Sequence, residues 1–118
     1  MLYIAIVEKD TEYAKRMQQM MTDLDAEFLL YDSYDSIDNI DRINILFANV
    51  NSKEDIDCVK QIYQKNPTIQ IVFYSEKIEC ALDAYDVRHV YFILKDEMEI
   101  KIKPAIERSL NHLKTIVC

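Results

Sequence analysis

The chain has 118 residues, of which 50% are hydrophobic, 30% are charged and 10% are aromatic. This length and mixed composition predict one globular domain over residues 1–118 and exclude an intrinsically disordered tail. The formal net charge of −7 argues against a basic face for nucleic-acid phosphates. We therefore expect no direct nucleic-acid binding by this domain.

Short apolar runs alternate along the chain with longer amphipathic segments. The apolar runs predict five β-strands, at Leu2–Val7, Ala26–Tyr31, Ile43–Val50, Ile69–Tyr74 and Val90–Leu94. A helix capped by Asp10 or Thr11 is expected to follow the first strand, and Asp32–Ile40 predicts a short polar helix or a loop. Further helices are predicted over Lys53–Asn66, over Ile78–Val87 and from Pro104 onward. On the second of these, Ile78, Ala81, Leu82 and Tyr85 share one helical face. On the last, the apolar face consists of Ile106, Leu110, Leu113 and Val117.

This alternation of five strands with helices predicts a parallel sheet covered on both faces, a three-layer α/β sandwich. Ligand chemistry in such folds lies at the carboxyl ends of the strands. In this chain those ends carry Glu8-Lys9-Asp10, Asn49, Ser75 and Lys95. These positions are therefore the candidate site.

The chain contains no glycine, where average usage would give roughly eight. Glycine forms the tight turns of the dinucleotide fingerprint, of the phosphate-binding loop and of the serine nucleophile elbow. None of these motifs can be present, so the common nucleotide-cofactor enzymes are excluded and we expect no organic cofactor.

Cysteine and histidine are too sparse for a metal centre. Cys58, Cys80 and Cys118 suit free thiols better than a disulfide framework or a zinc site. His89 and His112 lack partners at ligand spacing, so we expect neither a metal-binding nor a catalytic role for them.

Membrane and export signals are missing from the sequence. No apolar run approaches the roughly 18 residues of a membrane span. The N-terminus lacks the basic start and the cleavage site of a signal peptide. We expect a soluble, cytoplasmic protein that does not contact membranes.

Three segments, IAIVEKD, VFYSEKIECALDAYDV and YFILKDE, stand in the order and spacing of a known family. They resemble the receiver domains of two-component response regulators, closest to those of LytTR-type (LytR/AlgR/AgrA-like) regulators. The resemblance covers essentially the whole chain. It implies a flavodoxin-like, doubly wound sheet of five parallel strands in the order 2-1-3-4-5.

Receivers use an aspartate on the third strand as a nucleophile toward a phosphohistidine donor. Two acids after the first strand help to hold Mg²⁺, while a Ser or Thr and a lysine contact the phosphoryl group. The resemblance places Glu8 and Lys9 on the acid pair, Asn49 on the phosphoacceptor, Ser75 on the hydroxyl, Lys95 on the lysine and Phe92 on the switch aromatic.

The departures from this pattern concern the metal and the nucleophile. The Asn49 amide is a poor nucleophile that forms no ordinary acyl phosphate. Lys9 replaces a carboxylate, which leaves Glu8 as the remaining metal candidate, so Mg²⁺ binding is expected to be weak or absent. We expect the Lys9 ammonium to lie among Glu8, Asn49 and Asp10 and to replace part of the metal charge.

We therefore expect a non-enzymatic, degenerate receiver that acts through protein partners: an output domain, a histidine kinase or a second copy. The resemblance implies control of transcription through an attached or partner DNA-binding domain, and a stand-alone protein is the other reading. Receivers commonly pair through the fourth helix, fifth strand and fifth helix. The interface candidates of this chain are Tyr85, Tyr91, Lys101 and Arg108.

Two alternatives stay open. An active receiver would need Asp10, Asp55 or another acid in place of Asn49. We expect instead that Asp10 caps a helix and that Asp55 and Asp57 lie solvated in a first helical turn. Ser75 fits a role as a helix N-cap as well as it fits a role in the pocket. The remoter alternative is a small flavin-binding domain, against which the lack of glycine argues.

Overall fold

The computed structural model describes the backbone of residues 2–117 and the side chains of residues 2–114. Its strands are β1 (Leu2–Val7), β2 (Ala26–Tyr31), β3 (Ile45–Asn49), β4 (Gln70–Ser75) and β5 (Tyr91–Leu94). All neighbouring pairs are parallel, and the order is β2-β1-β3-β4-β5. The predicted five-stranded, doubly wound sheet is confirmed.

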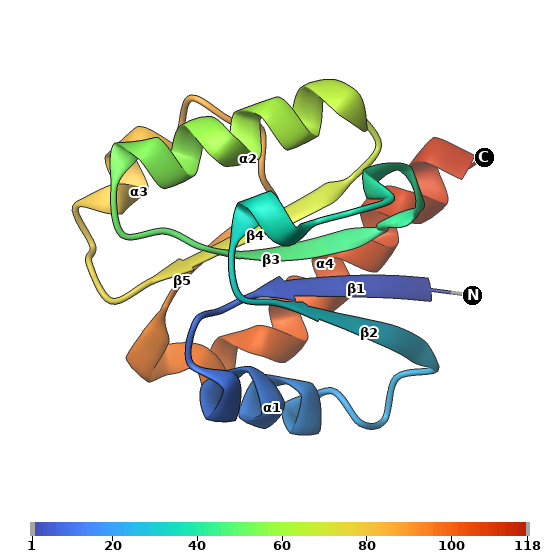
Figure 1. The fold of residues 1–118 in the computed structure, drawn as a ribbon. Helices are drawn as coiled ribbons and strands as arrows, with labels where there is room; N and C mark the ends of the chain where they lie inside the picture. Colours follow the sequence, from blue (N-terminus) through green and yellow to red (C-terminus); the bar gives the residue numbers. More distant parts are fainter. Residues whose placement is uncertain (1, 118) are drawn as a thin grey trace.

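Helices cover the sheet on both faces (Figure 1). They are α1 (Thr11–Met20), α2 (Lys53–Lys65), α3 (Cys80–Ala84) and α4 (Met98–Val117). The sheet lies between α1 and α4 on one side and α2 and α3 on the other. Short 3-10 turns at Tyr34–Ser36 and Ile40–Arg42 connect β2 to β3. No helix within the described backbone is long and apolar enough to span a membrane.

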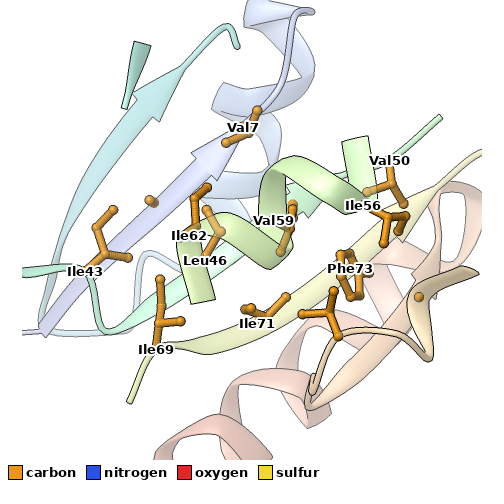
Figure 2. Close-up of a cluster of buried hydrophobic side chains, with 14 of the residues drawn as sticks. Val7, Ile43, Leu46, Val50, Ile56, Val59, Ile62, Ile69, Ile71 and Phe73 are labelled. Atoms are coloured by element: carbon orange, nitrogen blue, oxygen red, sulfur yellow. The ribbon is translucent and has the colours of Figure 1, made fainter. Parts of the chain in front are cut away.

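Two cores follow from the alternation of side chains along the strands. Ala5 and Val7 of β1 point to the core shared with α2 and α3, shown in Figure 2. Ile4 and Ile6 point to the core shared with α1 and α4. Because β3 and β4 are central strands with helices on both faces, their runs are almost wholly apolar.

The predicted helix over Ile78–Val87 is wrong in length and in orientation. The helix α3 spans only Cys80–Ala84, and Ile78 and Leu82 are exposed. The residues that face the core are Cys80, Ala84 and Val87. Both sets have helical spacing, and the set that faces the core has the smaller side chains. Periodicity alone favoured the larger, exposed set.

The predicted start of the last helix at Pro104 is also wrong. The helix α4 begins six residues earlier, at Met98, and Pro104 lies inside it. Proline there removes one hydrogen bond to the Ile100 carbonyl. Ile100 is exposed, so water can satisfy that carbonyl, and the buried side chains of Met98 and Ile102 hold the first turn. Of the predicted stripe, Ile106, Leu110 and Leu113 face the core, and Val117 lies outside the described side chains.

The two leucines Leu46 and Leu82 give a matched test of this arrangement. Leu46 is 0% exposed and Leu82 is 76% exposed. We expect Leu46→Ala to lower the free energy of unfolding by about 2–5 kcal/mol, because it leaves a cavity in the core. Leu82→Ala should change it by about 0.5 kcal/mol or less. Urea unfolding followed by circular dichroism measures both, and equal losses would contradict the orientation of α3.

Candidate functional site

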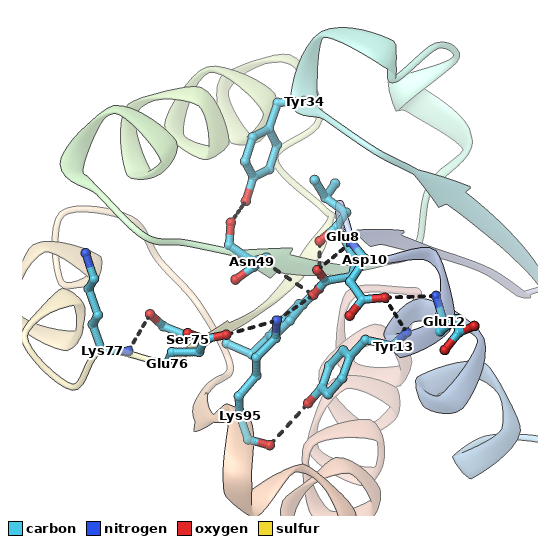
Figure 3. Close-up of polar contacts among 12 residues, drawn as sticks. Glu8, Asp10, Glu12, Tyr13, Tyr34, Asn49, Ser75, Glu76, Lys77 and Lys95 are labelled. Carbon is cyan, nitrogen blue, oxygen red and sulfur yellow. Dashed lines mark hydrogen bonds and ion pairs between the residues drawn. The ribbon is translucent and has the colours of Figure 1, made fainter.

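The polar strand ends meet at one edge of the sheet. Val7 lies opposite Ala48, and Asn49 lies opposite Tyr74, so the residues that follow these pairs are neighbours. Figure 3 shows Glu8, Asn49 and Lys95 converging from three different strand ends. The structure therefore brings together most of the positions singled out in the sequence.

The carboxylate of Glu8 is the centre of this cluster. Glu8 is only 5% exposed, and its Oε1 lies 3.1 Å from the Lys95 ammonium and 3.4 Å from Asn49 Nδ2. The Tyr74 hydroxyl is 3.0 Å from the same oxygen, while Oε2 accepts the backbone N–H of Asp10 at 3.0 Å. A buried carboxylate is costly unless it is paired and hydrogen-bonded. Here one cation and three further donors meet that requirement.

Tyr74 is a part of the site that the sequence analysis missed. Its side chain is fully buried in β4, and its hydroxyl also lies 2.7 Å from the Val7 carbonyl oxygen. Burial, and next the charge of Glu8, raise the pKa of this phenol well above its ordinary value. Tyr74 therefore stays neutral and acts as a hydrogen-bond donor. The only signal in the sequence is a phenol hydroxyl next to the apolar run at the centre of the strand.

Tyr13 fixes the position of Lys95. The Lys95 ammonium lies 4.4 Å from the centre of the Tyr13 ring, and the Tyr13 hydroxyl donates to the Lys95 carbonyl at 3.1 Å. Burial, then Glu8, raises the pKa of Tyr13 to about 12. A cation–π contact and a backbone hydrogen bond thus hold one lysine from the same ring. Glu76, at 3.6 Å, adds a second and more exposed carboxylate partner.

Lys9 does not take the place that we predicted for it. Its side chain is exposed and forms no ion pair or hydrogen bond with any described residue. The cation beside Glu8 is Lys95, which reaches the site from the end of β5. Lys9 follows the buried strand and lies at the rim of a neighbouring cavity instead.

The nitrogen and the oxygen of the Asn49 side-chain amide lie in different environments. Its Nδ2 donates to Glu8, whereas its Oδ1 is buried with no hydrogen-bond partner among the described residues. Its backbone carbonyl accepts a hydrogen bond from the hydroxyl of Tyr34, a residue that the sequence analysis did not single out. Burial, and next Asp55, hold the pKa of Tyr34 well above its ordinary value, so this phenol is a donor as well.

Ser75 has a local structural role, and so do Asp10 and Asp55, the acids considered as replacements for the nucleophile at position 49. The buried Ser75 hydroxyl accepts the Lys77 N–H at 3.0 Å and so supports the turn before α3. Asp10 caps α1 by accepting the N–H groups of Glu12 and Tyr13, as predicted. Asp55 accepts the Asn51 N–H at 2.9 Å in the first turn of α2.

A cavity of about 400 Å³ lies beside the cluster. Glu8, Asn49 and Lys9 line it together with Asp32, Asp35 and Asp55. It is the place where a ligand would reach the cluster from the side of the β2–β3 connection. A larger cavity of about 960 Å³, lined by Tyr13, Lys95 and Ile78, opens on the other side.

The remaining predicted positions lie away from Glu8. Phe92 is half-buried and packs against the core below α2 and α3. Tyr91 lies under the Arg108 guanidinium, 5.0 Å from ring centre to Cζ. Tyr85 is exposed and Lys101 is half-buried. Their switch and interface roles stay predictions.

Comparison with known proteins defines the fold class. No protein-family model matches the chain, and no curated protein matches it. Among solved structures, a response regulator receiver domain from Clostridium thermocellum aligns with a TM-score of 0.84 at 13% identity, over 98% of this chain and 99% of that one. The response regulatory domain of protein mrkE from Klebsiella pneumoniae aligns with a TM-score of 0.83 at 18% identity, over 97% and 99%.

A third similar structure is the signal receiver domain of an HD domain-containing protein from Pseudomonas fluorescens Pf-5. It aligns with a TM-score of 0.79 at 13% identity, over 97% of this chain and 98% of that one. The chain therefore has the fold of response-regulator receiver domains.

The Glu8–Lys95 pair gives a quantitative test of the cluster. Lys95→Met should lower the free energy of unfolding by about 3–5 kcal/mol, since it leaves a buried carboxylate without its cation. Adding Glu8→Gln should recover part of that loss, giving a coupling energy above about 1 kcal/mol. Urea unfolding at neutral pH of the four proteins in the double-mutant cycle measures it.

The exposed pair Arg16–Glu99 is the matched control. Its charged groups are 3.7 Å apart, with 61% and 75% of the side chains exposed. Its double-mutant cycle should give a coupling of about 0–1 kcal/mol. Equal coupling in the two pairs would show that Glu8 is not the buried centre described here.

Proposed function

We propose that this chain is a degenerate receiver: a signalling domain that acts through protein contacts, without aspartyl phosphorylation at Asn49 and without Mg²⁺. The observation that supports the proposal is that one cation and three hydrogen-bond donors already surround the Glu8 carboxylate. The sequence resemblance and the receiver fold support the assignment to signalling rather than to enzymatic catalysis.

The nucleophile is the first reason. In an active receiver, a carboxylate oxygen attacks the phosphorus of the donor, a new P–O bond forms and the donor leaves. The Asn49 amide is neutral, and its Nδ2 is occupied in donating to Glu8. An amide at this position is a poor nucleophile.

The donor set for a metal is the second reason. Mg²⁺ prefers several oxygen ligands with octahedral geometry. Here both oxygens of Glu8 already accept hydrogen bonds, and the Lys95 ammonium occupies the position of a counter-cation at 3.1 Å. No group of three His, Cys, Asp or Glu within the described residues could hold a metal ion. The residues of this site therefore do not fit Mg²⁺.

The alternative of an active receiver depends on Asp55. Asp32, Asp35 and Asp55 line the same 400 Å³ cavity as Glu8 and Asn49, and of these the sequence analysis singled out Asp55. Its hydrogen bond from Asn51 N–H and its place in the first turn of α2 favour a structural role instead.

Acetyl phosphate with Mg²⁺ tests the proposal. The natural chain should show no added phosphoryl group by intact mass and no change in melting temperature. The double variant Lys9→Asp, Asn49→Asp restores the two missing carboxylates, and it should gain the phosphoryl mass as its new carboxylate attacks phosphorus and acetate leaves. Phosphorylation of the natural chain that Asp55→Asn abolishes would establish the alternative and refute the proposal.

We further propose that partners bind the face formed by α3, β5 and α4, with control of transcription as the output that the LytTR-type resemblance implies. Ile78, which precedes α3, is exposed, and so are Leu82 and Tyr85; the Arg108 guanidinium of α4 lies over the Tyr91 ring of β5. Aromatic and arginine side chains are enriched at protein interfaces. With a neutral Asn49, this face should keep one arrangement.

Sedimentation velocity at rising protein concentration tests self-association through this face. We expect a dimer that dissociates when Leu82→Glu and Tyr85→Glu are introduced together. The control Gln19→Glu on the exposed side of α1 should leave the dimer intact. A monomer at every concentration, or a dimer that survives the double change, would contradict the proposed self-association.

A further inference from the structure

A third cavity lies at the opposite end of the sheet from Glu8. We call it the basic cavity; its volume is about 290 Å³, and its polar lining residues are Tyr63, Thr68, Gln70, Arg88, His89 and His112. Although the chain carries 21 Asp and Glu, none of those within residues 2–114 lines it. Its charged and titratable groups are Arg88, the two histidines and the Tyr63 phenol.

The hydrogen bonds around this cavity define the tautomer of His89. His89 Nδ1 lies 2.7 Å from the Val87 carbonyl oxygen, which can only accept. Nδ1 therefore carries a hydrogen, and Nε2 is the ring nitrogen outside this hydrogen bond.

His112 is oriented in the same way. The buried Gln70 donates its Nε2 to the Thr68 carbonyl at 2.9 Å, so its Oε1 is the acceptor that faces His112 Nδ1 at 3.2 Å. His112 Nδ1 then carries the hydrogen. Two imidazoles from distant segments thus line one cavity. In each of them Nδ1 forms the hydrogen bond described above, and Nε2 takes no part in it.

Arg88 differs from the other arginines of the chain. Arg16, Arg42 and Arg108 each lie over a tyrosine ring. Arg88 forms no ion pair and stacks on no ring within the described residues, and its side chain lines the basic cavity. A guanidinium without a partner has its full set of donors available for a planar or tetrahedral oxyanion.

We propose that the basic cavity is an oxyanion-binding site for a phosphate-like or carboxylate group. Arg88 supplies a permanent charge and two parallel donors, and no Asp or Glu of the described residues lines the cavity to repel an anion. The volume of about 290 Å³ suits a small anionic group. The alternative ligand of two imidazoles, a transition metal, is disfavoured by the Arg88 charge and by the lack of a third ligand in the described chain.

This site is independent of the proposed receiver function. It lies at the amino ends of β4 and β5, whereas Glu8 and Lys95 lie beyond the carboxyl ends of their strands. The six residues of β4 separate the two ends by about 16 Å at ~3.3 Å per residue. Failure of one proposal therefore leaves the other intact.

Titration with sodium sulfate and with sodium acetate, followed by amide chemical shifts, tests the proposal. Both probes are anions at neutral pH. We expect saturable shifts centred on the amides of residues 68–71, 88–90 and 112. Tighter binding of sulfate would indicate a phosphate-like ligand, and tighter binding of acetate a carboxylate.

Two variants make the test specific. Arg88→Gln should weaken binding about tenfold or more, as expected for loss of a charge-assisted hydrogen bond. Arg16→Gln removes an equal charge outside the cavity and should leave the affinity within about twofold. Equal effects of the two arginine changes, the absence of saturable shifts, or binding of Zn²⁺ alone would overturn the proposal.

Discussion

The burial of one carboxylate constrains the whole carboxyl edge of this sheet. Glu8 ends a central strand, and its charge is removed from water by the surrounding side chains. Its partners come from the ends of three other strands: Asn49 from β3, Tyr74 from β4 and Lys95 after β5. A slip of one residue in any strand would turn that partner to the other face of the sheet. The strand register and the polar cluster therefore depend on each other.

Because Lys95 provides the counter-charge, the buried Glu8–Lys95 pair is neutral without any added ion. In the receivers that this chain resembles, a divalent cation adds positive charge at this edge and a phosphoryl group adds negative charge. Here the aromatic rings of Tyr13 and Tyr74 shield the ion pair from solvent on the side of α1. On the proposed function, the domain therefore rests in one electrostatic state, and a partner would recognise a fixed surface rather than a switched one.

The sequence was sufficient for the strands and the Asp10 cap, because these depend on local pattern, and the family resemblance implied the strand order. It placed Glu8, Asn49 and Lys95 at one edge of the sheet because the carboxyl ends of parallel strands share an edge, but it put Lys9 beside Glu8, where the structure has Lys95. It was insufficient for Tyr74 and Tyr34, whose hydroxyls cannot be told from core aromatic residues until the strands are placed. The orientation of α3 failed because two sets of residues share helical spacing. His89 and His112 are 23 positions apart in sequence, and only the fold brings them to one cavity.

The charges around Glu8 also explain why an amide suits position 49. A carboxylate there would place a second negative charge beside Glu8, with Lys95 as the only cation in contact with Glu8 among the described residues. Like charges at this distance in a buried site disfavour ionisation of both groups. An aspartate at this position would thus require either a metal ion or a second cation, whereas Asn49 donates to Glu8 and leaves the pair balanced. The buried Asn49 Oδ1 is unpaired among these residues, a cost of about 1–3 kcal/mol, and it is smaller than that of an uncompensated buried charge. On the proposed function, the amide and the lysine are therefore matched parts of one site that acts without a metal ion.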